Sequence, residues 1–399
     1  MNNEELAIQS FIRSNPNTWE DLLTSSPYFI SVSRDHVCNR NLMLLKYSQL
    51  DTIWDKAGKI AREARGIILD EDTLEVVNYG FDKFFNSGEP HADKIDATSM
   101  KSTTKIDGSI LKIRLFNDGE LLISTNGTID AFKAPVALQL NCKFDSFGSI
   151  VKNVIVNKFG SLDEFKKHLD TDKTYMFEMV SPWTRVVTPY HENDMYLIGC
   201  RSLDPSKSYG EIPFWECQLA KFFKTPEILD FSSIDRCLEY AQTLDWTSEG
   251  FVVVDKNFHR VKVKNAAWLS VHHLCQNHIM SYRRALEIVK ANEIDEVVAY
   301  FPEFKDSLLK VKDDYFGMIR RLDDAWKRYL GTSADLGSRK DQALSIKREF
   351  GKLAGAGFSF LDKKCIDGQE YVSKMPLSNL IKMLGYKDQR NDEEGQQEV

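Results

Sequence analysis

The sequence contains no long uncharged apolar run, no paired cysteines and no basic excess, and each absence excludes a class of protein. No apolar run among its 399 residues approaches the roughly 18 that a membrane-spanning helix needs, so we expect no membrane partner. The N-terminus, Met-Asn-Asn-Glu-Glu, lacks the basic and then apolar layout of a secretory signal. The seven cysteines are scattered without a Cys-x-x-Cys pair, which argues against a disulfide framework and predicts a reducing, cytoplasmic compartment.

The formal net charge is −7, which excludes a surface that is basic throughout. A protein that contacts nucleic acid needs positive charge opposite the phosphates. Any phosphate contact must therefore come from a local cluster of basic residues on an acidic chain.

The sequence does contain ample apolar surface, with 42% hydrophobic residues, 24 Phe, 14 Tyr and 7 Trp. Such a composition predicts packed domains rather than a disordered chain. Residues 29–264 are rich in strand patterns, whereas apolar residues after 265 recur at spacings of three and four, which is typical of helices. We therefore predict an α+β protein with an N-terminal domain over residues 1–265, an all-α domain over 266–386 and a disordered acidic tail over 387–399.

Local patterns predict several finer features. Leu111, Ile113 and Leu115 alternate with Lys112 and Arg114, which is the period of a half-buried strand, and a tight turn at 117–119 closes a hairpin. Helices are expected in the first thirty residues, near 162–169 and 234–244, over 282–291, through the long pattern at 308–329, and over 341–353. The Gly-Ala-Gly at 355–357 is expected to break the helical pattern.

One pentapeptide is the most informative about chemistry: Lys105-Ile106-Asp107-Gly108-Ser109. It lies between a predicted strand over 100–104 and the first strand of the hairpin. A lysine at a strand end, followed by a glycine turn, can project its amine into a cleft. The amine becomes a nucleophile when desolvation or nearby cations lower its pKa. An exposed lysine before a turn is the alternative for this pentapeptide alone.

Charged residues inside apolar strands strengthen the first interpretation. Glu178 and Glu249 each interrupt an apolar run, where a carboxylate is costly unless a cation, a metal or a hydroxyl group contacts it. Lys262 and Lys264 share one face of a strand and repel each other unless an anion lies between them. A phosphate would satisfy both.

Two further cations precede the pentapeptide. Arg65 begins an apolar strand, and Lys83 stands beside two aromatic residues. Arginine suits a bidentate grip on phosphate. Each of these residues alone is compatible with a solvated strand end. Together, and in this order, they predict a nucleotide triphosphate pocket with an embedded nucleophile.

These motifs resemble those of the covalent nucleotidyltransferases, which include ATP-dependent ligases and mRNA-capping guanylyltransferases. Three further motifs narrow the resemblance to the RNA ligase 1 family, the phage-type ligases of tRNA repair. The three motifs are Glu63-x-Arg65-Gly66, Lys83-Phe84-Phe85-Asn86 and Pro182-x-x-Arg185-Val186-Val187. The similarity runs from about Tyr47 through Lys264 and continues more weakly through the helical region, at 339–341 and 351–357. It implies an N-terminal nucleotidyltransferase domain built on antiparallel sheets.

The resemblance also implies roles for individual residues. Lys105 would attack the α-phosphate of ATP and hold AMP as a phosphoramidate, with Asp107 and Gly108 beside it in the ATP site. Glu178 would bind the ribose hydroxyls, and Lys262 and Lys264 would hold the α-phosphate.

The remaining roles concern the other phosphates and the metal. Arg65 and Lys83 would orient the β- and γ-phosphates, with Tyr47 nearby. Glu249 and Asp295 would lie near Mg²⁺, for which Mn²⁺ is an alternative.

The implied reaction joins a 3′-hydroxyl to a 5′-phosphate on RNA. We expect a monomer that acts on single-stranded ends or on a broken stem-loop such as tRNA, in the cytoplasm of a bacterial or phage-infected cell. An end-healing kinase or phosphatase would act in sequence with it.

The chain departs from the family at Ser124 and Asn126, where lysines are expected, which puts any phosphate contact by those lysines in doubt. Two other functions stay open: a DNA ligase or capping-type enzyme, and a non-catalytic protein that binds RNA ends. The first is disfavoured by the helices that follow Lys264, where a small β-barrel is usual, and the second by the intact set of cationic residues.

Overall fold

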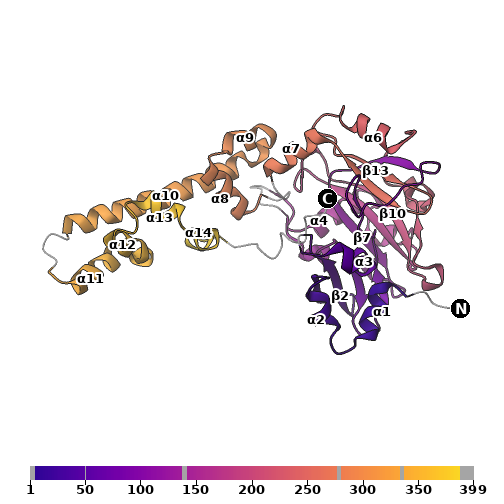
Figure 1. Cartoon of the computed structure of the whole chain (residues 1–399), viewed down its shortest axis with the longest axis horizontal. Coiled ribbons are helices and arrows are strands. Elements are labelled where there is room, and N and C mark those ends of the chain that lie inside the picture. Colours follow the sequence, from indigo (N-terminus) through magenta and orange to yellow (C-terminus); the bar gives the residue numbers. More distant parts are fainter. Residues whose placement is uncertain (1–4, 50, 137–141, 276–279, 333–336, 387–399) are drawn as a thin grey trace. The chain divides into compact units, whose positions relative to one another are not determined.

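The computed structural model describes residues 5–49, 51–136, 142–275, 280–332 and 337–386. They form two compact units, one before residue 276 and one from residue 280 onward (Figure 1). The first unit is the strand-rich one and the second is helical, so the predicted α+β class is confirmed. Within the described residues, no helix is long and apolar enough to cross a membrane.

A four-stranded antiparallel sheet in the order β1-β2-β3-β4 begins the first unit. Its strands are β1 (Ile30–Val37), β2 (Arg40–Tyr47), β3 (Arg65–Asp70) and β4 (Val76–Asn78). The helices α1 (Ala7–Ser14), α2 (Trp19–Thr24) and α3 (Trp54–Glu63) pack beside it, and their apolar side chains share a core with β2 and β3 (Figure 1). The two predicted N-terminal helices are confirmed, while α3 was not predicted.

Two five-stranded sheets complete the first unit, in the orders β11-β10-β9-β7-β8 and β12-β6-β13-β14-β5. We call them the β7 sheet and the β6 sheet. The β7 sheet contains β7 (Ser109–Leu115), β8 (Leu121–Ser124), β9 (Lys173–Val180), β10 (Asp194–Ser202) and β11 (Glu211–Ile212). The β6 sheet contains β5 (Phe85–Asn86), β6 (Lys101–Thr104), β12 (Ile228–Leu229), β13 (Gly250–Val254) and β14 (Arg260–Lys264), and only β5 joins it in parallel.

Helices cover one face of each of these sheets. On the β7 sheet, Leu111, Ile113 and Leu115 pack against α4 (Phe147–Phe159), with α5 (Leu162–Lys166) beside it. On the β6 sheet, α6 (Ile234–Ala241) packs over β13 and β14. The predicted helices at 162–169 and 234–244 are confirmed, and α4 was not predicted. The opposite faces of the two sheets contribute to one small apolar cluster, which joins Ile110 and Met176 to Val252.

The hairpin of β7 and β8 forms as predicted, but the expectation that β7 is half-buried is wrong. The alternate residue Lys112 is fully buried, with 0% of its surface exposed. Its face of β7 lies against the first sheet, since Nζ of Lys112 donates a hydrogen bond to the carbonyl of Gly66 on β3. A strand covered on both faces shows no polar face to solvent, so sequence alternation misjudged its burial.

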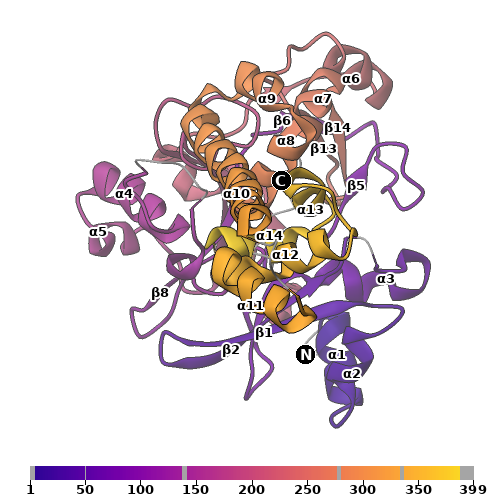
Figure 2. The same cartoon turned by 90° about the vertical axis from the view of Figure 1, so that its left-hand side faces the viewer.

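The second unit is all-α. It contains α8 (Tyr282–Ala291), α9 (Ile294–Tyr300), α10 (Lys305–Thr332), α11 (Arg339–Phe350), α12 (Ala354–Leu361), α13 (Gly368–Ser373) and α14 (Leu377–Leu384). The long helix α10 carries the predicted apolar stripe, and α8, α11, α12 and α13 lie along it (Figure 2). The expected break at 355–357 is wrong. Gly357 lies inside α12, where a Cβ would come within 2.6 Å of Ile346, so the glycine permits close packing on α11.

The predicted boundary at residue 265 precedes α7 (Ala266–Cys275), whereas the compact division follows that helix. Trp268 of α7 is fully buried, and its indole Nε1 donates a hydrogen bond to Asp107 at 3.1 Å. α7 therefore packs as part of the first unit. Whether residues 1–265 fold independently stays a prediction, and the predicted disordered tail at 387–399 lies outside the described residues.

Candidate active site

Lys105 stands directly after β6, in a turn held between two strands. Its backbone N–H donates to the carbonyl of Gly250 on β13 at 2.8 Å. Gly108 lies so close to the carbonyl of Met179 on β9 that a Cβ at residue 108 would collide with it. The turn is therefore fixed against both sheets, which directs the lysine side chain into the space between them.

The ammonium of Lys105 contacts a buried carboxylate. Its Nζ lies 2.7 Å from Oε2 of Glu249, and Nζ of Lys264 lies 3.3 Å from Oε1 of the same residue. The Glu249 side chain has no exposed surface. Burial opposes its ionisation, but the charges of Lys105 and Lys264 outweigh that effect and hold the pKa of Glu249 below its usual value. Lys264 also lies over the ring of Trp268, 4.9 Å from its centroid.

A pocket opens between the β7 and β6 sheets beside Lys105. Apolar side chains form much of its wall, among them Phe81, Phe84, Ile110, Ile198 and Val252. Four cations and two carboxylates line the same pocket: Arg65, Lys105, Arg260 and Lys262, with Glu178 and Glu211. An apolar wall with a few converging charged groups is the usual construction of a site for a nucleotide-sized ligand.

The charged lining is strongly desolvated. Burial, reinforced by Arg65 and the other cations, lowers the pKa of Lys262 well below its ordinary value. Burial also lowers the pKa of Arg65 to about 10, against the attraction of Glu178. For Glu178 burial acts in the opposite sense and raises the pKa to about 8, although Lys105 opposes the shift. Cations crowded without enough anions mark a pocket suited to a polyanion.

Lys83 lies beside the predicted Tyr47 in a group of aromatic rings. Its Nζ is 5.0 Å from the ring centroid of Tyr47, 5.6 Å from Phe85 and 6.0 Å from Trp54. Burial, together with the positive charge of Arg65, lowers the pKa of Lys83 to about 7. Sequence reasoning paired Lys83 with Tyr47 but missed Trp54, which comes from α3, a helix that was not predicted.

Asp107 is buried and acts as an acceptor for three donors. Its Oδ2 accepts hydrogen bonds from the backbone N–H groups of Val187 at 3.0 Å and Thr188 at 2.6 Å, as well as from Trp268. Burial raises its pKa, against those hydrogen bonds. These contacts show that Asp107 fixes the surrounding backbone, and its direct contact with ATP stays a prediction.

The two predicted metal carboxylates differ in setting. Glu249 lies in the site, whereas Asp295 lies on α9 in the second unit and is exposed. Among the described residues, no cluster of three or more His, Cys, Asp or Glu side chains could hold a metal ion. Mg²⁺ often binds through one or two carboxylates together with substrate phosphates, so Glu249 alone is compatible with it. The role of Asp295 stays a prediction.

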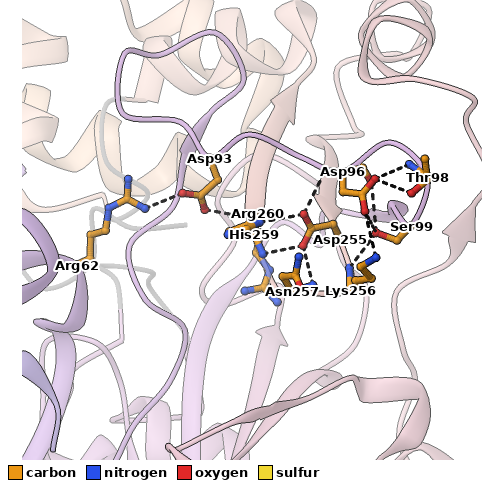
Figure 3. A network of polar contacts seen from close by, with 10 residues as sticks. All are labelled: Arg62, Asp93, Asp96, Thr98, Ser99, Asp255, Lys256, Asn257, His259 and Arg260. Atoms are coloured by element: carbon orange, nitrogen blue, oxygen red, sulfur yellow. Dashed lines mark hydrogen bonds and ion pairs between the residues drawn. The ribbon is translucent and has the colours of Figure 1, made fainter.

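A polar network that sequence reasoning missed ties the segment before Lys83 to β14. Oδ1 of Asp93 accepts from Arg62 at 2.8 Å, and its Oδ2 accepts from the backbone N–H of Arg260 at 3.1 Å (Figure 3). The carbonyl of Arg62 in turn accepts from the backbone N–H of Lys83 at 2.8 Å. Asp93 therefore links Arg62, whose carbonyl holds the backbone of Lys83, to the first residue of β14, two residues before Lys262. Its partners lie far apart in the sequence, so no local pattern marks it.

The same network anchors the turn between β13 and β14. Asp255 accepts hydrogen bonds from the backbone N–H groups of Asp96, Asn257 and His259 (Figure 3). The turn and the loop around Asp96 are thus held together at the end of β14 that precedes Lys262.

The departures at Ser124 and Asn126 lie close to the pocket wall. Ser124 is directly opposite Lys112 in the pairing of β8 with β7, and both side chains are fully buried. Asn126 is buried against Gly66, the residue after Arg65. Although residue 124 is not a lysine, Lys112 on the neighbouring strand β7 supplies a basic side chain at this place.

A lysine at a strand end, two buried carboxylates and several basic side chains thus meet at the pocket between the two five-stranded sheets, an arrangement compatible with the predicted nucleotide site. The sequence model described as RNA ligase matches residues 63–268, more than half of the chain. This chain belongs to that RNA ligase family, which confirms the predicted resemblance.

Two of the curated relatives that match this chain show the extent of the similarity. A protein of Autographa californica nuclear polyhedrosis virus, named as a bifunctional polynucleotide kinase/RNA ligase, is 30% identical over 277 residues, covering 66% of this chain and 38% of that protein. An RNA ligase of Rhodothermus phage RM378 is 27% identical over 354 residues, covering 72% of this chain and 76% of the phage protein. The chain thus spans well under half of the baculovirus protein.

Solved structures show a more distant likeness. An archaeal ATP-dependent RNA ligase aligns with a TM-score of 0.44 at 12% identity, covering 86% of this chain and 89% of that one. A Naegleria gruberi RNA ligase mutant with ATP and Mn aligns with a TM-score of 0.32 at 14% identity, covering 44% of this chain and 51% of that one.

Proposed function

We propose that this protein is an ATP-dependent RNA ligase that seals a 3′-hydroxyl to a 5′-phosphate through a lysyl-AMP intermediate. The observation that carries the proposal is the position of Lys105, whose Nζ contacts Glu249 at the edge of a cation-lined pocket. Membership of the RNA ligase family supports RNA as the substrate.

In the first step, the ammonium of Lys105 releases a proton to solvent, its neutral Nζ attacks the α-phosphorus of ATP, and a second proton leaves the nitrogen as the phosphoramidate forms. An N–P bond forms, the bond from phosphorus to the bridging oxygen breaks, and pyrophosphate leaves with the electron pair. Lys262 and Lys264 stabilise the charge on the α-phosphate, and Glu178 accepts or donates hydrogen bonds at the ribose hydroxyls. Arg65 and Lys83 orient the β- and γ-phosphates.

A divalent metal, when bound, neutralises phosphate charge and assists departure of pyrophosphate. Glu249 is the described residue best placed to hold its hydration shell. In the structure the negative charge of Glu249 offsets the repulsion between the ammonium groups of Lys105 and Lys264. ATP and metal would take over part of that charge balance.

The later steps use RNA. AMP passes from Lys105 to the 5′-phosphate of one RNA end, and the 3′-hydroxyl of the other end displaces AMP to form the phosphodiester. The name of the baculovirus relative pairs a polynucleotide kinase with an RNA ligase, and this chain spans 38% of that protein. We therefore propose that a separate kinase or phosphatase activity prepares the ends of a broken tRNA or similar stem-loop for this ligase.

One labelling experiment tests the proposal. The protein is incubated with Mg²⁺ and α-labelled ATP or GTP, denatured, and examined for retained label that resists alkali and is released by acid. We expect label from ATP with wild-type protein and none with Lys105→Ala or Lys105→Arg. Preferential labelling by GTP would favour a capping-type enzyme, absence of label a non-catalytic RNA-end-binding protein, and undiminished labelling of either variant would remove Lys105 from its role.

A further inference from the structure

Arg65 reaches the nucleotide pocket from an irregular point in β3. Leu45 pairs with Ile67 and Lys46 pairs with Arg65, so Gly66 is an extra residue between the two pairs. This is a β-bulge, a feature that redirects a neighbouring side chain. Gly66 has φ of +72°, and a Cβ there would come within 2.5 Å of the carbonyl oxygen of Asn126. Only glycine fits this conformation and this close approach.

The carbonyl of the bulge residue is held by a buried lysine from another sheet. Nζ of Lys112, on β7, donates a hydrogen bond to the oxygen of Gly66. The stem of Lys112 passes Gly80, where a Cβ would lie 3.1 Å from its Cδ. Asn78 fixes the same strand, since its Nδ2 donates to the carbonyl of Lys112 and to Oγ of Ser124. The side chain of Lys112 is thus held in one conformation, with its ammonium at the carbonyl of Gly66.

The burial of Lys112 near other cations costs free energy when its amine is charged. Burial lowers the pKa of Lys112 to about 7, and the positive charges of Arg65 and Lys46 add to the effect. The charged groups that act on Lys112 are thus cations, which add to the cost of burying its ammonium. A buried amine whose charged neighbours are cations contributes little to stability in the empty protein, which suggests a functional reason for its place.

We propose that Lys112 is a positioning residue for ATP binding: by holding the carbonyl of Gly66, it fixes the bulge that directs Arg65 into the nucleotide pocket. This inference rests on the proposed function, in which Arg65 binds the β- and γ-phosphates. Lys112 pairs across the strands with Ser124, one of the two positions where the sequence departs from its family. Lys112 supports the phosphate site from beneath without lining the pocket itself.

Loss of Lys112 should affect the two reactions of the proposed enzyme differently. Adenylylation of Lys105 needs Arg65, because ATP carries β- and γ-phosphates. Sealing of an RNA that already carries a 5′-adenylate does not, because those phosphates have left. A lysine that merely fills the space between sheets would affect both reactions together, through loss of folded protein.

The test compares Lys112→Met with Arg114→Met. Arg114 is two residues along the same face of β7, and its guanidinium donates to the carbonyls of Val76 and Val77 rather than to Gly66. Adenylylation of Lys105 is measured against ATP concentration, sealing is measured with a pre-adenylylated RNA, and thermal melting is recorded for every variant. Should Lys112→Met fail to fold, Lys112→Gln replaces it, since its shorter side chain keeps a hydrogen-bond donor.

For the Lys112 variant we expect the ATP concentration for half-maximal labelling to rise about tenfold, with sealing of pre-adenylylated RNA unchanged within about twofold. Arg114→Met should leave both reactions at wild-type values at temperatures where it is folded. Parallel losses in both reactions, or unchanged labelling by the Lys112 variant, would overturn the inference. Failure of wild-type protein to label at all would instead remove the proposed function.

Discussion

Nζ of Lys105 and Oε2 of Glu249 lie 2.7 Å apart, and the carboxylate that closes this ion pair is fully buried. Glu249 also contacts Lys264, so one carboxylate balances the nucleophile and one of the lysines expected to hold the α-phosphate. The arrangement holds the nucleophile in a defined place. It also means that Glu249 contributes to both stability and chemistry, which the sequence did not distinguish.

The first prediction separates these two contributions with Glu249→Gln. The substitution preserves shape but leaves the partly buried ammonium groups of Lys105 and Lys264 without their counter-charge, so we expect the free energy of unfolding to fall by about 3 kcal/mol. Adenylylation should fall about a hundredfold at a temperature where the variant is fully folded, because Lys105 loses its fixed position. Chemical denaturation and single-turnover labelling measure the two effects.

The pH dependence of stability provides the control. The folded-state pKa of Glu249 lies below its unfolded value, so its stabilisation is present above the unfolded pKa and is lost as the pH falls through the folded one. Wild-type protein should therefore lose more stability on acidification than Glu249→Gln. Equal acid sensitivity, with adenylylation intact in the variant, would contradict the assignment.

The second prediction concerns Lys83, whose pKa of about 7 is set by burial and by repulsion from Arg65 and Lys264, against the attraction of Glu89. Its positive charge is present below that value and is lost above it. We therefore expect the ATP concentration for half-maximal adenylylation to rise as the pH increases from about 6 to about 9.

Lys83→Arg tests this directly, because a guanidinium stays charged across the whole range. The variant should show a flatter dependence than wild type, measured with the same ATP and metal concentrations. Any pH dependence of the half-maximal ATP concentration that remains in the variant comes from other groups, including Lys112, whose pKa is also about 7. If both proteins show the same slope, Lys83 does not contribute its charge to ATP binding.

Local patterns predicted much of the site because its main residues stand at strand ends or alternate along a strand. Lys262 and Lys264 share a face of β14, and Lys105 follows β6, as their spacing indicated. Burial of Lys112 could not be predicted in this way. It depends on a second sheet that packs over the face of β7 carrying Lys112. The sequence of β7 alone does not indicate this contact.

The predicted break at 355–357 was wrong for a related reason. Gly355 and Gly357 suggested a break because glycine weakens an isolated helix. In the structure, Gly357 allows α12 to approach Ile346 on α11, and tertiary packing outweighs the local preference. The Arg62–Asp93–Arg260 network likewise could not be predicted from local patterns, since the residues that contact each other are separated by 31 residues or more in the sequence.

The third prediction addresses that network. In Asp93→Ala, Arg62 and the backbone N–H of Arg260 lose their shared acceptor, so the segments that carry Lys83 and Lys262 become less well fixed. We expect a loss of about 1–2 kcal/mol in the free energy of unfolding and a several-fold rise in the ATP concentration for half-maximal adenylylation. Lys256→Ala is the matched control, because Lys256 is exposed and pairs with Asp96 at the outer side of the network. If both variants change ATP dependence equally, Asp93 has no special part in the site.

The fourth prediction concerns the choice of substrate and rests on the helical unit. The described residues of α11 to α14 carry more basic than acidic side chains, in contrast to the acidic chain as a whole. Arg339 and Lys340 begin α11 and are exposed, although Arg339 also pairs with Asp362. Because side chains read RNA through its shape and unpaired ends, we expect a broken stem-loop and single-stranded RNA to be sealed well and nicked duplex DNA poorly.

The double substitution Arg339→Gln/Lys340→Gln tests whether this unit selects the substrate. Sealing of a broken stem-loop should fall relative to joining of an unstructured RNA of equal length, while labelling of Lys105 by ATP stays at the wild-type rate. Arg320→Gln/Arg321→Gln is the matched control, since it removes two exposed charges from α10. Equal effects of both double variants would mean that net charge, rather than the start of α11, matters. Nicked DNA sealed as fast as either RNA would contradict the RNA-ligase assignment itself, because the two ends at such a nick are DNA ends held in a duplex rather than unpaired RNA ends.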